Sequence, residues 1–129
     1  MHLGSLAAVY AEWTGKDTKR VATGRRPVVG VVSILDDKDA AGMLTELLPK
    51  CDALVATASQ NTRALPPPTL ASLAEQLGGP MAEVIREPRA ALARGRELAG
   101  SGGVVVATGS IYLVADLLRP AGTGRASML

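Results

Sequence analysis

The stretch VVGVVSILDDKD, residues 28–39, limits most strongly what this chain can fold into. Its first eight positions are almost all apolar, so a strand here would need other elements packed against both of its faces. Strands buried on both faces are typical of parallel sheets that lie between two layers of helices. The run ends in three aspartates around Lys38, and open α/β sheets bind their ligands beyond the carboxyl ends of their strands. We therefore expect a functional site at this turn.

The rest of the chain alternates between helical and extended patterns. After the strand at 28–35, the patterns predict strands at 53–57, 81–86 and 103–107. They predict helices at 3–13 (on the stripe Leu3, Leu6, Tyr10, Trp13), 39–50, 69–77, 88–100 and from Ile111 to about Leu118. Such alternation is typical of a mostly parallel sheet with right-handed crossovers. We therefore predict an α/β, Rossmann-like domain of three layers with about four strands.

Three of the four turns that follow these strands carry polar side chains suited to ligand binding. Because the carboxyl ends of parallel strands meet at one edge of a sheet, we expect these side chains to lie close together. An anionic or zwitterionic small molecule would suit them, although the aspartates are equally suited to capping the next helix. The residues are Asp37, Lys38 and Asp39 in the first turn, Asn61 and Arg63 in the second, and Thr108 and Ser110 in the last.

Composition excludes several classes of site within this chain. The single cysteine, Cys51, and the single histidine, His2, exclude a disulfide framework, a cysteine metal site and a histidine-carboxylate catalytic pair. The chain has 14 Lys and Arg residues against 12 Asp and Glu residues, and it has no Phe. This composition argues against nucleic-acid binding. No apolar run reaches the ~20 residues of a membrane span, so we expect a cytoplasmic protein. The basic segment 16–27 is interpreted as a solvated loop or as a phosphate-steering segment.

Two common nucleotide-binding motifs are missing from the sequence. It contains neither GxGxxG after a strand nor GxxxxGK[ST]. A phosphoacceptor receiver domain also places paired acids after a buried strand. That class needs a further aspartate after a central strand and a lysine after the last one, where this chain has Thr57 and the turn Thr108-Gly109-Ser110.

Three motifs together resemble the C-terminal domain of folylpolyglutamate synthase/dihydrofolate synthase, in the wider Mur ligase family. They are the DKD turn at 37–39, NxRAxPP at 61–67 and TGSxYLV at 108–114, in the family's order and spacing. The resemblance covers residues 28–119. It implies a Mur ligase C-terminal-like domain over 1–120, with an N-terminal helix and basic loop (1–27), a core (28–119) and a flexible tail (121–129).

The resemblance implies an ATP-dependent ligase that adds glutamate to folate through an acyl phosphate. The family holds ATP and Mg²⁺ mainly on a P-loop domain that this sequence lacks, so no catalytic residue or metal ligand is assigned in this chain. By matching motifs, Arg63, Ser110 and Asn61 would bind substrate, whereas Asp37, Lys38 and Asp39 would serve nucleotide binding or domain closure.

The sequence departs from the family pattern at its start. The family's domain opens with a strand ending in DGAHNP, which is not found here, and His2 is not assigned to it. We therefore expect a severed or truncated ligase domain that is inactive alone and forms a homodimer through an exposed sheet edge. Which of the two synthase activities the parent enzyme has stays open. The alternative is a stand-alone α/β module that binds a small anion or amino acid without catalysis.

Overall fold

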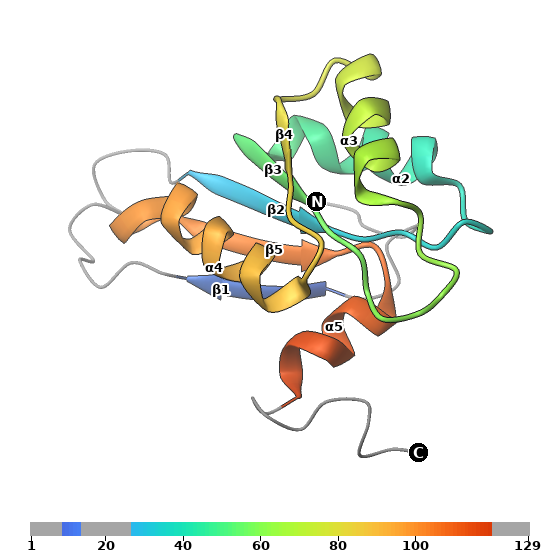
Figure 1. Ribbon diagram of the computed structural model, residues 1–129. Coiled ribbons are helices and arrows are strands. Elements are labelled where there is room, and N and C mark those ends of the chain that lie inside the picture. The colour runs from blue at the N-terminus through green and yellow to red at the C-terminus, as the bar shows by residue number, and fades with distance from the viewer. Residues whose placement is uncertain (1–8, 14–26, 120–129) are drawn as a thin grey trace.

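In the part of the chain that the structure describes, one sheet of five strands forms the centre (Figure 1). The computed structural model describes the backbone of residues 9–13 and all of residues 27–119. The strands are β1 (Val9–Trp13), β2 (Val28–Val32), β3 (Ala53–Ala56), β4 (Ala82–Val84) and β5 (Val104–Thr108). The helices are α2 (Ala40–Leu47), α3 (Pro67–Gln76), α4 (Pro88–Ala99) and α5 (Ile111–Leu118), with short 3₁₀ turns η1 (Leu48–Lys50) and η2 (Gly100–Gly102).

The four predicted strands are parallel, which confirms the α/β, Rossmann-like prediction. The strand order is β1-β5-β2-β3-β4, and β2 pairs in parallel with both β3 and β5. The chain runs from β2 outward through β3 to β4, then crosses back to place β5 on the other side of β2. The carboxyl ends of β2 and β5 therefore flank a topological switch point, where α/β sheets open a ligand crevice.

Two apolar cores lie on opposite faces of the sheet and produce the predicted three layers. One core joins α2 and α3 to the sheet and includes the fully buried Leu44, Leu54 and Leu70. The other joins α4 and α5 to the opposite face and includes Val31 and Leu113. Figure 1 shows α2 and α3 on one side of the strands and α4 and α5 on the other.

The prediction of an N-terminal helix at 3–13 is wrong for residues 9–13, the part of this segment that the structure describes. Residues Val9–Trp13 form β1, which pairs antiparallel with β5 from Val9 opposite Thr108 to Trp13 opposite Val104. The sequence VYAEW is rich in residues that favour strands, and pairing satisfies the backbone groups on the outer side of β5. In so short a segment, the spacing of the apolar residues does not distinguish a helix from a strand.

Helix α3 begins two residues earlier than predicted. Pro67 and Pro68 form its first turn, although the three prolines were expected to precede the helix. Proline suits this position because the first N–H groups of a helix have no intrahelical partner and its φ is already helical. The prolines therefore set the start of α3 as well as the direction of the chain.

Several sequence-based expectations lie outside the described residues. These are the part of the predicted helix before residue 9, His2, the basic segment at 16–26 and the tail at 121–129. Within residues 9–13 and 27–119, no helix has the length and apolar character needed to cross a membrane.

Candidate functional site

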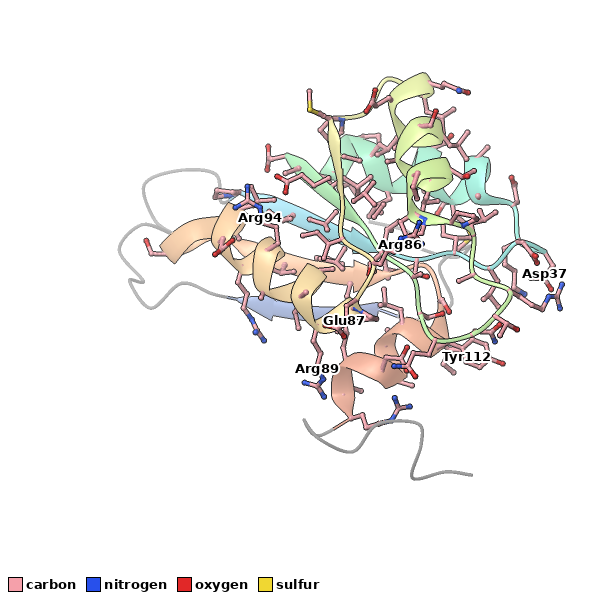
Figure 2. The ribbon with its side chains drawn as sticks, in the orientation of Figure 1. Asp37, Arg86, Glu87, Arg89, Arg94 and Tyr112 are labelled. Atoms are coloured by element: carbon pink, nitrogen blue, oxygen red, sulfur yellow. The ribbon has the colours of Figure 1, made fainter. Side chains whose placement is uncertain are left out.

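A pocket of about 490 Å³ opens at the switch point between the ends of β2 and β5. Its walls are formed by the turn after β2, the loop after β3 and the turn after β5, together with one residue of α2 and the first turn of α5. The lining residues are Leu35, Asp37, Lys38, Met43, Asn61, Arg63, Gly109, Ser110, Ile111 and Tyr112. Figure 2 shows Asp37 and Tyr112 at the same end of the molecule, and Arg94 at the other.

The turn after β2 presents Asp37 and Lys38 to the pocket, whereas Asp39 begins the next helix. The Asp39 Oδ1 atom accepts a hydrogen bond of 3.0 Å from the backbone N–H of Gly42. Asp39 is thus the N-cap of α2, one of the two interpretations that the sequence left open. It does not line the pocket.

The loop after β3 is held against the turn after β2 by backbone hydrogen bonds. The N–H of Asp36 donates to the carbonyl of Arg63, and the N–H of Leu65 donates to that of Ile34, both at 2.8 Å. Within the loop, Asn61 Oδ1 accepts from the N–H of Arg63 at 2.8 Å. The backbone that carries Asn61 and Arg63 is therefore fixed relative to the DKD turn.

The turn after β5 places Ser110 at the start of α5. Its Oγ atom accepts a hydrogen bond of 3.0 Å from the N–H of Tyr112 and caps the helix. Ser110 is 5% exposed. Because a hydroxyl both accepts and donates, its O–H remains able to donate to a ligand. Thr108, the last residue of β5, is fully buried and does not line the pocket.

Charges of both signs meet in the pocket. The Arg63 guanidinium lies 3.4 Å from an Asp36 oxygen and 3.3 Å from an Asp37 oxygen, and all three side chains are substantially exposed. Within the described residues, Lys38 makes no ion pair. The pocket therefore combines cationic and hydroxyl donors with a carboxylate acceptor, which suits a ligand carrying carboxylate and ammonium groups.

The structure brings together five of the six predicted site residues. Asp37, Lys38, Asn61, Arg63 and Ser110 all line the pocket, and only Asp39 does not. Sequence reasoning missed the apolar walls because apolar residues of strands and helices are usually assigned to the core; these residues are Leu35, Met43, Ile111 and Tyr112. It also missed Asp116, a buried carboxylate in the otherwise apolar α5.

The described residues do not fit a metal site or a reactive thiol. Among residues 9–13 and 27–119, no three His, Cys, Asp or Glu side chains are grouped so that they could hold a metal ion. Burial, together with the nearby Asp52 carboxylate, raises the pKa of the Cys51 thiol to about 11. A thiol that stays protonated at neutral pH is a poor nucleophile, in agreement with a structural role.

A family comparison matches most of this chain. Residues 14–111 match the family described as Mur ligase, glutamate ligase domain. That range includes all six predicted site residues. A search of curated proteins finds no match.

Solved structures with a similar fold include three folylpolyglutamate synthases. The enzyme of Mycobacterium tuberculosis, complexed with ADP and AMPPCP, is 31% identical over 73% of this chain, with a TM-score of 0.66. The bifunctional folylpolyglutamate synthase/dihydrofolate synthase of Yersinia pestis, complexed with AMPPNP and a Mn ion, is 24% identical over 85%, with a TM-score of 0.64. The Thermotoga maritima enzyme is 23% identical over 81%, with a TM-score of 0.62. This chain spans only 23–24% of the length of these three proteins.

Proposed function

Because the chain belongs to the Mur ligase family, through its match to the glutamate ligase domain, we propose that it is the amino-acid-binding part of an ATP-dependent ligase that adds glutamate to folate. The single observation that carries this proposal is the pocket at the switch point, where all three resembling motifs converge. The 31% identity to the Mycobacterium tuberculosis folylpolyglutamate synthase supports folate over other acids.

In this proposal the pocket binds and orients glutamate. Arg63 pairs with a glutamate carboxylate, while the Ser110 hydroxyl and the Asn61 amide donate hydrogen bonds to it. Asp37 and Lys38 also line the pocket, and in this proposal they meet the nucleotide or the partner domain when the enzyme closes. Asp39 holds that turn in place as the cap of α2. Oriented in this way, the glutamate amine would attack the activated folate carboxylate, whose phosphate then leaves.

ATP and Mg²⁺ would be held mainly by a P-loop ATPase domain, and this chain would add contacts to the nucleotide only from Asp37 and Lys38. The sequence lacks GxxxxGK[ST], and the donor set of the described residues does not fit a metal site. The proposed partners are therefore that domain, with glutamate and folate as substrates. Cytoplasmic localisation stays a prediction from the sequence.

The test measures glutamate-dependent ADP release by this chain combined with the P-loop ATPase domain of a folylpolyglutamate synthase. We expect no release by the chain alone and sustained release by the combination. Lys38→Ala or Ser110→Ala should each lower turnover at least tenfold, because a lost charge-assisted contact costs about 1.5–3 kcal/mol.

Matched controls use the same substitutions away from the pocket. Lys50 in η1 and Ser72 on α3 are both exposed and do not line it. Lys50→Ala and Ser72→Ala should leave turnover unchanged. Near-normal kinetics in both pocket variants would reject the site, whereas saturable glutamate binding by the chain alone would favour the alternative of a stand-alone binding module.

Self-association through a sheet edge is a separate prediction. The edges of the sheet are β1 and the three-residue β4, so the strand β5 is not itself an open edge. Met81, next to β4, is 81% exposed. We expect light scattering to show a dimer whose fraction rises with concentration; a monomeric mass at every concentration would exclude it.

A further inference from the structure

Helix α5 carries one buried carboxylate that the residues assigned to the pocket do not explain. The Asp116 side chain is 4% exposed and lies between the core residues Leu113 and Leu117 in the sequence. A charged group at such a position lowers stability unless its oxygens are paired, and an apolar residue would pack at least as well. We therefore expect the two carboxylate oxygens of Asp116 to accept hydrogen bonds that an apolar side chain at this position could not.

Each oxygen of Asp116 accepts from a different part of the chain. Oδ1 accepts from Arg119 Nη1 at 2.9 Å, within the same helical turn. Oδ2 accepts at 2.9 Å from the backbone N–H of Gln60, which is 56 residues away. Gln60 immediately precedes Asn61, so the second bond joins α5 to the loop that carries two of the pocket residues.

The loop is thereby anchored at both ends. At its far end, the bonds from Asp36 to Arg63 and from Leu65 to Ile34 attach it to the turn after β2. At its near end, the bond between Gln60 and Asp116 attaches it to α5, the helix that Ser110 caps. We propose that Asp116 is a positioning residue, which sets the distance across the pocket between the loop and the start of α5 and so determines the affinity for glutamate.

This proposal rests on the proposed function, and its test begins with a measurement that needs no ligand. Hydrogen exchange of the Gln60 amide is compared between the parent chain and Asp116→Ala, Asp116→Asn and Leu113→Ala. We expect exchange at least tenfold faster in Asp116→Ala, with most protection kept in Asp116→Asn, whose side chain retains an acceptor oxygen. Leu113→Ala weakens the same helix without touching the bond, so it should speed exchange throughout the fold without singling out Gln60.

The second measurement is the KM for glutamate when the chain is combined with the P-loop ATPase domain. Asp116→Ala should raise KM at least fivefold with kcat within twofold of the parent value, and Asp116→Asn should restore most of the affinity. The proposal is overturned if Gln60 responds no more to Asp116→Ala than to Leu113→Ala, or if Gln60 is released and KM does not change. If ligation itself fails while Gln60 responds as expected, the proposed function falls and the anchoring of the loop stands.

Discussion

Gly109→Ala is expected to lower the free energy of unfolding by about 2–6 kcal/mol. Gly109 has φ +105°, a conformation that costs a residue with a Cβ about 1–3 kcal/mol. An added Cβ would also lie 2.5 Å from the backbone oxygen of Ser33 and 3.0 Å from Ile34 Cγ1. The crowding adds about 1–3 kcal/mol, because a backbone oxygen at the end of β2 cannot move without moving the strand.

Gly78→Ala is the matched control for this experiment. Gly78 has φ +85°, but an added Cβ there would meet no atom within 4 Å. It should therefore cost only the conformational part, about 1–2 kcal/mol. Urea denaturation of both variants measures the difference, and equal losses would show that the contact between Gly109 and Ser33 is unimportant.

Leu113→Ala is expected to cost about 2–5 kcal/mol, the range for truncating a buried leucine. Leu113 is fully buried in the core between α4, α5 and the sheet. Removing its side chain leaves a cavity beneath the helix that carries Ser110. We expect a clear fall in the midpoint of urea denaturation.

The same substitution on the other side of α5 provides the comparison. Leu118 is 63% exposed. Leu118→Ala should change stability by no more than about 0.5 kcal/mol. A similar loss for both variants would mean that α5 does not pack on the sheet as described.

Much of the fold, and the grouping of the candidate site residues at one edge, could be predicted from the sequence because the strongest signals were local. The apolar run of β2 could only be a doubly covered strand, and such a strand specifies its layers of helices. Once the strands were known to be parallel, their carboxyl ends had to share an edge. That rule brought Lys38, Arg63 and Ser110 together without any knowledge of side-chain contacts.

The errors arose where long-range pairing outweighs local pattern. Residues 9–13 form a strand because they pair with the edge of β5, and the local sequence VYAEW does not indicate that partner. Asp39 looked equivalent to Asp37 in the sequence, but only geometry separates the helix cap from the pocket wall. Asp116 could have been noticed as the single charge in YLVADLL, yet its partner Gln60 lies in a distant loop.

The position of β5 has a consequence for how the molecule assembles. Of the strands that the structure describes, β5 comes last in the sequence, but it lies between β1 and β2 and is the sheet partner of β1. During synthesis β1 can therefore take its place in this sheet only after β5 has been made. Contacts between such distant segments slow folding. The pocket also needs the turn after β5, so all of its walls are present only once the chain has been made as far as Tyr112.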